Sequence, residues 1–116
     1  MATGTIKGNS VESFSLSFGS MVSASDRIAN CYKCGRIVSI NIQIKITATT
    51  AKTISDLFTI PSGYRPYSGI FFAAIDNTND LVMNGSISAS TGGCTLYRNH
   101  TTSMSAVRLG VTYICE

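Results

Sequence analysis

The sequence predicts an all-β fold, an antiparallel β-sandwich or jelly roll of about eight strands. Its 116 residues include 13 Ile, 6 Val and 13 Thr against 5 Leu, 4 Lys, 2 Glu and 1 Gln. β-Branched side chains lose freedom in a helix and pack well on a pleated sheet, so this balance favours strands. Apolar and polar residues also alternate with period two, which is typical of strands with one buried face. We expect a single domain at residues 11–116 after a flexible lead-in at residues 1–10.

Three strands are predicted by alternation alone. Every second residue is apolar in residues 13–18, 38–47 and 107–113. The longest of these segments places one valine and four isoleucines on one face, with Ser, Asn, Gln, Lys and Thr on the other. We therefore expect each segment to bury one face and to expose the other.

Weaker patterns complete the series of strands and turns. In chain order they predict a short strand at 28–32 closed by the turn Lys33–Cys34–Gly35, a strand at 52–60 that runs into the turn Pro61–Ser62–Gly63, a strand at 69–75 that is apolar on both faces, a loop at 76–80, a strand at 81–89, a break at 91–93, a strand at 94–98 and a polar loop at 99–102. Inside the strand at 81–89, Asn84–Gly85 indicates a hairpin or a bulge. Strands at this spacing are typical of two antiparallel sheets packed face to face.

Composition and charge argue against several classes of protein. Hydrophobic residues make up 44% of the chain, which is not typical of disorder. No apolar run approaches the roughly 18 residues that a membrane-spanning helix needs, and residues 1–9 lack the apolar centre of a secretory signal. The net charge is only +3 and the nine basic residues are scattered, so nucleic-acid binding is not expected. The pairs Tyr32–Lys33 and Tyr97–Arg98 could equally stack on a sugar ring or hold a turn.

The polar faces of the predicted strands carry few charges. Lys45 and Arg108 are the only charged residues in the two longest alternating segments. Exposed strand edges are usually protected by charge or proline. Two interpretations remain open, an ordinary soluble sandwich with a bland surface or a domain partly covered by copies of itself.

The four cysteines allow three interpretations. Cys31 and Cys34 form a C-x-x-C pair, but Cys94 and Cys115 lie 21 residues apart and do not form the second pair typical of a zinc site. A redox pair would require a helix N-terminus in an α/β unit, which the sequence does not predict. The third interpretation is free thiols, with room for one disulfide. Cys115 shares a strand face with Tyr113, so we expect it to point into the core.

Enzymatic chemistry is not expected. His100 is the only histidine, and it lies in the polar segment 98–102 without a recognisable nucleophile motif. The six carboxylates are scattered, and only Asp76 and Asp80 lie close together, across one loop. The same loop, residues 76–80, could hold a calcium ion, but an Asx-rich turn without metal explains the same residues. We therefore predict no catalytic residues, no metal and no cofactor.

One segment resembles a known family. Leu57–Phe58–Thr59–Ile60–Pro61–Ser62–Gly63–Tyr64–Arg65–Pro66 is a strand that runs into a turn, because its prolines restrict φ and its glycine allows positive φ. It is similar to the L-hydrophobic-T-I-P-x-G-Y-R-P segment in the C-terminal head domains of phage tail fibres and receptor-binding proteins, particularly those of phages and prophages of Gram-positive hosts. Residues 33–40 resemble the family's K-x-G-x-x-V-x-I entry to a long strand, residues 81–87 its hairpin and residues 111–114 its last strand. The resemblance covers residues 28–115, although the C-x-x-C pair is not a feature of the family.

The resemblance implies a β-sandwich head similar in shape to the trimeric C1q and tumour-necrosis-factor folds. It implies a homotrimer at the tip of a tail fibre in the virion, made in the cytoplasm of a bacterial host. It also implies attachment to host-surface carbohydrate or another envelope receptor, with the rest of the fibre as a partner and no insertion into a membrane. Weak sites on a trimer gain strength from multivalency. The P-x-G-Y-R-P turn is interpreted as structural.

Because such heads bind through variable loops, the resemblance assigns no binding residues, and we choose candidates from the polar loops and exposed aromatics. The receptor-binding candidates are Tyr32, Tyr64, Asp76, Asn77, Asn79, Asp80, Tyr97, Arg98, Asn99 and His100. Three alternatives remain: a purely structural tip that trimerises a fibre, a hydrolase or thiol redox protein, and a secreted C1q-like or lectin-like binding domain.

Overall fold

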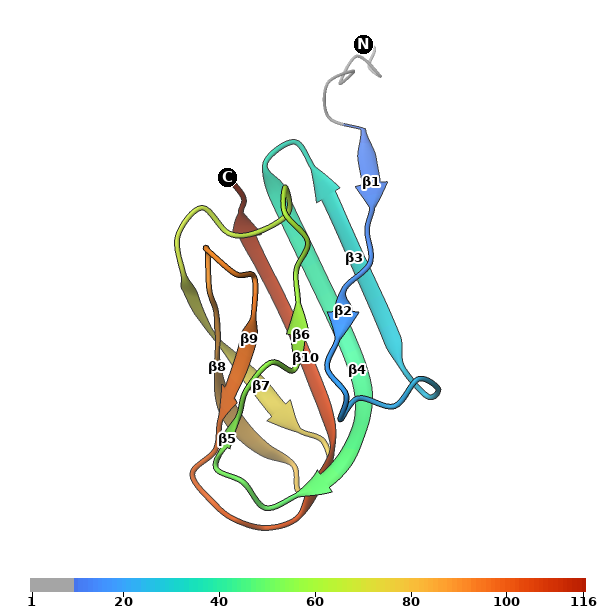
Figure 1. Ribbon diagram of the computed structural model, residues 1–116, viewed down its shortest axis with the longest axis vertical. Helices are drawn as coiled ribbons and strands as arrows, with labels where there is room; N and C mark the ends of the chain where they lie inside the picture. The colour runs from blue at the N-terminus through green and yellow to red at the C-terminus, as the bar shows by residue number, and fades with distance from the viewer. Residues whose placement is uncertain (1–9) are drawn as a thin grey trace.

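The computed structural model describes residues 10–116, which form ten β-strands and no helix (Figure 1). The strands are β1 (Val11–Ser13), β2 (Ser17–Phe18), β3 (Ile28–Cys34), β4 (Ile37–Thr49), β5 (Thr53–Ile54), β6 (Phe58–Thr59), β7 (Ile70–Asp76), β8 (Leu81–Ile87), β9 (Cys94–Tyr97) and β10 (Met104–Ile114). Eight of them form one antiparallel sheet in the order β1-β3-β4-β10-β7-β8-β9-β5, and β2 pairs with β6. The all-β prediction is confirmed. None of the described residues belongs to a helix long and apolar enough to cross a membrane. Of the lead-in expected at residues 1–10, only Ser10 lies within the described residues.

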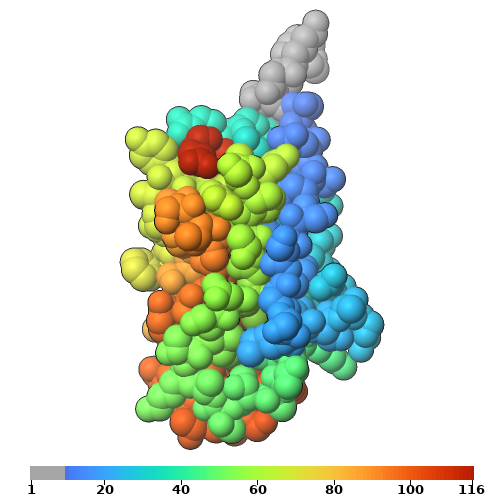
Figure 2. All heavy atoms as spheres, viewed as in Figure 1, coloured from blue at the N-terminus to red at the C-terminus, as the bar shows by residue number. Residues whose placement is uncertain are grey.

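The large sheet curls so that its β9 end lies in a layer opposite its central strands. β4, β10 and β7 lie in one layer, and β9 lies in the other beside β6. The Leu57 backbone N–H donates to the Cys94 carbonyl at 3.0 Å, and Thr59 forms a bridge with Gly93, so β6 extends the second layer beyond β9. The β2–β6 pair then adds the N-terminal segment to the edge of this layer, which Figure 2 shows as a blue stripe beside a green one.

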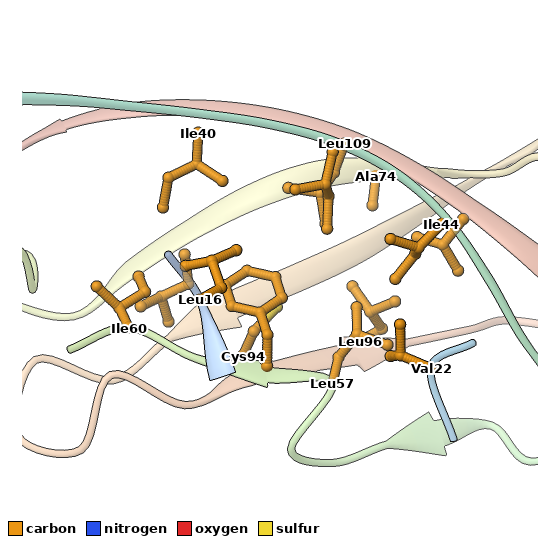
Figure 3. Close-up of a cluster of buried hydrophobic side chains, with 14 of the residues drawn as sticks. Leu16, Val22, Ile40, Ile44, Leu57, Ile60, Ala74, Cys94, Leu96 and Leu109 are labelled. Atoms are coloured by element: carbon orange, nitrogen blue, oxygen red, sulfur yellow. The ribbon is translucent and has the colours of Figure 1, made fainter. Parts of the chain in front are cut away.

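One hydrophobic core lies between the two layers (Figure 3). Side chains of both layers point toward each other, with Ile40, Ile44, Ala74 and Leu109 on one side and Leu16, Leu57, Ile60 and Leu96 on the other. The five apolar residues from Val38 to Ile46 in β4 are all at most 6% exposed. Burying one such side chain contributes about 1.5–3 kcal/mol. The alternation that predicted β4 is therefore the pattern that builds the core.

The strand predictions hold for most segments and fail for two, residues 13–18 and 52–60. β4 and β10 contain the two longest alternating segments, and β7 lies within one residue of the predicted strand at 69–75. The segment 13–18 is not one strand, because the chain changes partners there: β1 pairs with β3, and β2 pairs with β6 in the other layer. The strand predicted at 52–60 is divided into β5 and β6, because Asp56 takes a left-handed φ of 55°. These breaks give ten strands instead of about eight.

Two predicted turns are also wrong. β3 continues to Cys34, and the hairpin turn is Gly35–Arg36, where Gly35 has a φ of 62°. Asn84–Gly85 is neither a hairpin nor a bulge but the middle of β8, where Gly85 pairs with Phe72 and Leu96. A β-carbon at Gly85 would lie 2.5 Å from the Phe72 ring. The glycine is required for the close approach of this ring, not for a change of direction.

The segment that resembles the phage family joins several parts of the fold. The Arg65 side chain donates from Nε to the Ile60 carbonyl at 2.8 Å and from Nη1 to the Ser90 carbonyl at 3.0 Å. Pro66 forms a bridge with Cys115 near the end of β10. These contacts agree with the interpretation of the P-x-G-Y-R-P turn as structural.

The four cysteines do not gather into a metal site in the described part of the chain. Cys31 points into the core from β3, and Cys34 points to the opposite face, because they lie three positions apart in a strand. Cys31, Cys94 and Cys115 are free buried thiols, and the prediction that Cys115 points into the core is confirmed. Burial raises the pKa of Cys31 to about 11 and that of Cys94 to about 12. No group of metal-ligating side chains occurs among residues 10–116.

Candidate functional site

The structure brings the two predicted polar loops together at one end of the sheet. The loop after β7 contacts the loop before β10, where the Asn79 side-chain Nδ2 donates to the Ser103 carbonyl at 3.1 Å. The Ser105 backbone N–H donates to the Thr78 hydroxyl at 3.0 Å. Residues that lie more than twenty positions apart in the sequence therefore form one surface.

Beneath this surface lies a cluster of three ionisable side chains, Asp76, Arg98 and His100. Asp76 is the last residue of β7 and Arg98 directly follows β9. Arg98 Nη2 lies 3.9 Å and His100 Nε2 lies 3.6 Å from Asp76 Oδ2. Arg98 Nη2 also lies 3.4 Å from His100 Nδ1. The carboxylate, the guanidinium and the imidazole thus contact one another pairwise.

Asp76 is fully satisfied by its own loop. Its Oδ1 accepts the backbone N–H groups of Thr78 and Asn79, each at 3.0 Å, and its Oδ2 accepts the Asn79 side-chain amide at 2.9 Å. Burial alone would raise the pKa of Asp76, but these hydrogen bonds and the nearby Arg98 charge outweigh burial and hold the pKa below its ordinary value. The loop is the Asx-rich turn that the sequence allowed, with its carboxylate oxygens directed at protein donors.

Arg98 joins three segments of backbone. Its Nη1 donates to the carbonyls of Thr49, at 3.3 Å, and Ala51, at 2.8 Å, and its Nη2 donates to the Thr102 carbonyl. The Arg98 backbone N–H also donates to the Lys52 carbonyl at 2.7 Å. Arg98 Nε and His100 Nε2 are buried without a hydrogen-bond partner among the described residues. The cluster therefore closes this end of the fold.

Burial divides the predicted receptor-binding residues into two groups. Asp76 is 0% and Arg98 4% exposed, so neither side chain is accessible to a macromolecular receptor. Asn77, Asn79, Tyr64 and His100 are half-buried, whereas Tyr32, Asp80, Tyr97 and Asn99 are exposed.

The three tyrosines among the candidates lie apart. Tyr64 stacks on Phe14 with ring centroids 4.2 Å apart, and the Lys33 amine lies 5.3 Å from its ring. Tyr32 lies on the outer face of β3, where it pairs with Ser39. Tyr97 lies at the end of β9, and its hydroxyl is 3.4 Å from the Ser86 hydroxyl. Only Tyr97 is close to the loop cluster, because Arg98 follows it directly.

Sequence reasoning missed a groove on the outer face of β7, β8 and β9. It has a volume of about 390 Å³ and is lined by Asp56, Gly69, Ile70, Phe71, Ser86, Ile87, Ser88, Thr91, Gly93, Thr95 and Tyr97. The available signal was the pair Phe71–Phe72, since adjacent residues of a strand point to opposite faces and one ring must face outward. Phe71 does so and is 86% exposed.

A second hollow of about 320 Å³ lies on the outer face of β3, β4, β10 and β7. It is lined by Ile28, Asn30, Asn41, Ile42, Gln43, Ala73, Ile75, Arg108, Leu109 and Gly110. Gly110 leaves room for the Asn41 side chain, because a β-carbon there would lie 2.6 Å from the Asn41 side-chain oxygen. This lining contains amides and one arginine but no aromatic ring.

Comparison with solved structures finds a similarity over almost the whole chain. The chain is similar to the head domain of phage bIL170, whose crystal structure raises the question of a common fold for the receptor-binding domains of lactococcal phages. The TM-score is 0.70 at 13% identity, over 92% of this chain and 100% of that domain. The chain has the fold of a phage receptor-binding head domain. No protein-family model matches the chain. No curated protein sequence matches it either.

Proposed function

We propose that this protein is a receptor-binding head domain of a phage tail, which attaches the virion to its host cell. The observation that carries the proposal is the similarity to the bIL170 head domain, which extends over that whole domain. A fold can serve several functions, so the site must supply further support. The exposed loop residues and the outer groove supply it, because both offer polar and aromatic groups on a rigid sheet.

We further propose that three copies assemble at the tip of the tail fibre. The outer face of the large sheet supports this, because it carries large apolar side chains and few charges. On β3, β4 and β10, Ile28 is 55%, Ile37 47% and Ile114 56% exposed. β4 and β10 each contain one charged residue, Lys45 and Arg108. An exposed apolar face of this kind is typical of a surface that another chain covers.

The receptor that we propose is a carbohydrate of the host cell surface. Individual sugar sites bind weakly, and a trimer on each of several fibres would multiply them into firm attachment. Exposed hydroxyl, amide and aromatic side chains are the groups that such a ligand requires. The exposed candidates Tyr32, Tyr97 and Asn99 belong to these types, and the Asp80 carboxylate adds a hydrogen-bond acceptor.

Light scattering on a sizing column, with and without reductant, tests the assembly. We expect a molar mass of about 37 kDa, three times the 12.3 kDa of the chain, and no effect of reductant, because the buried thiols do not hold the copies together. A stable monomer would contradict the trimer.

A second candidate function is a structural tip that trimerises the fibre without touching the receptor. The burial of Asp76 and Arg98 favours it, since two of the predicted contact residues serve the fold instead. Purified protein that is trimeric but never binds cells would support this alternative. Protein that binds cells would exclude it.

A further inference from the structure

We propose that the groove between Phe71 and Tyr97 is a sugar-binding site for an uncharged glycan segment. This inference rests on the proposed function, and it names a place and a ligand class for receptor binding. The groove lies on the outer face of β7, β8 and β9, away from the buried Asp76 cluster, and measures about 390 Å³. That volume is within the usual range of roughly 300–1,000 Å³ for small-ligand sites.

The walls of the groove are aromatic. Phe71 is 86% exposed, more than the other large hydrophobic residues in the described part of the chain. Its neighbour Phe72 fills the space above Gly85, so strand alternation holds the Phe71 ring outward. Tyr97 stands on the other side, 43% exposed. A sugar ring has an apolar C–H face, and packing this face on an aromatic ring removes apolar area from water.

The floor of the groove is made of hydroxyl groups. Ser86 and Thr95 are directly opposite each other in the β8–β9 pair, and Ser86 lies 3.4 Å from the Tyr97 hydroxyl. Thr91 adds a third hydroxyl at the rim. Hydroxyl groups donate and accept, so they match the hydroxyl groups of a sugar in either direction.

Asp56 is the one charged side chain among the described residues that line the groove. A carboxylate accepts hydrogen bonds from two neighbouring sugar hydroxyls and repels an anionic sugar. The backbone next to it is held in place, because the Gly19 N–H donates to the Leu57 carbonyl and the Leu57 N–H donates to the Cys94 carbonyl, each at 3.0 Å. A preformed acceptor loses little freedom on binding. This charge selects an uncharged glycan over an acidic one.

The test uses the full chain on an array of immobilised oligosaccharides. The array carries neutral oligosaccharides of glucose, galactose, rhamnose and N-acetylhexosamine beside the same backbones bearing a carboxylate or a phosphate. Wild-type protein is expected to bind neutral members. Phe71→Ala should weaken binding at least tenfold, whereas the control Val82→Ala, an exposed apolar residue outside the groove, should stay within twofold. Asp56→Asn should weaken binding to neutral glycans and reduce the discrimination against acidic ones.

Several results would overturn the inference: no binding to any glycan, a preference for the acidic members, or unchanged binding by both Phe71→Ala and Asp56→Asn. If Phe71→Ala loses glycan binding and light scattering shows that it has also become monomeric, Phe71 belongs to a contact between copies and the groove is not the site. Cell binding is measured in parallel to separate the two proposals. Wild-type protein that binds cells but no glycan through the groove retains the proposed function and loses this inference. Protein that binds glycans through the groove but binds no cell retains this inference and contradicts the proposed function.

Discussion

Arg98→Met is the substitution that most directly tests how the loop end of the fold is held. Methionine keeps much of the length and apolar packing of arginine but cannot donate hydrogen bonds. The change leaves the carbonyls of Thr49, Ala51 and Thr102 without their side-chain donor. Asp76 keeps the three hydrogen bonds from its own loop, but it loses the Arg98 charge that lies 3.9 Å from its Oδ2.

The expected cost follows from these contacts. A buried carbonyl without a partner costs about 1–3 kcal/mol. Thr102 and Ala51 are exposed residues and Thr49 is half-buried, so water can reach some of the carbonyls. We therefore expect a loss of about 2–4 kcal/mol in the free energy of unfolding. For a domain of this size this corresponds to a Tm lower by roughly 8–16 °C, at about 4 °C per kcal/mol.

Thermal unfolding followed by circular dichroism measures the effect, with Arg108→Met as the matched control. Arg108 is exposed on the outer face of β10, so its replacement should change stability by no more than about 0.5 kcal/mol. The reasoning is refuted if Arg98→Met lowers the Tm no more than Arg108→Met does. The hydrogen bonds of the Arg98 side chain would then contribute little to the stability of this end of the fold.

Three further predictions concern the core, acid stability and the thiols. Gly85→Ala should destabilise the fold by about 1–3 kcal/mol because its β-carbon meets the Phe72 ring. Adding Phe72→Ala should make the glycine substitution less costly, with the 3.1 Å approach to Leu96 remaining; equal effects in both backgrounds, in urea unfolding, would contradict the contact with Phe72. The pKa of Asp76 is lower in the folded state, so its contribution to stability is present at neutral pH and is lost as the pH falls through the folded pKa, below the ordinary 3.8. Asp76→Asn should flatten the decline in Tm over that acidic range, and an unchanged decline would refute it. Because the pKa values of Cys31 and Cys94 are raised to about 11 and about 12, both thiols should resist iodoacetamide at pH 8 in the native protein and react in urea; rapid native labelling of either residue, seen by peptide mass spectrometry, would contradict their burial.

The sequence predicts this fold as far as local periodicity determines it. The residues from Val38 to Ile46 alternate, and their strand buries one face because nothing interrupts the pattern. Where tertiary structure decides, periodicity fails. The residues from Ser13 to Phe18 alternate equally well, but the chain passes from one layer to the other between them. Asn84–Gly85 has the composition of a turn, and only the Phe72 ring on the neighbouring strand explains why it is not one.

The candidate site was predicted less completely for a similar reason. Sequence reasoning identified the two polar loops, and the structure joins them into one surface. It placed Asp76 and Arg98 among the receptor-binding candidates because both begin polar loop segments. Their burial depends on partners such as Ala51 that lie far away in the chain. The groove beside Phe71 combines β7, β8, β9 and Asp56, and no local pattern places these together.

Binding of the purified, fluorescently labelled full chain to intact bacteria tests the central claim most directly. The account predicts saturable binding to some strains of a Gram-positive panel that includes lactococci, with unlabelled protein competing for the same sites. Folded, trimeric protein that binds no strain, or binds all of them without saturation, would contradict a receptor-binding head.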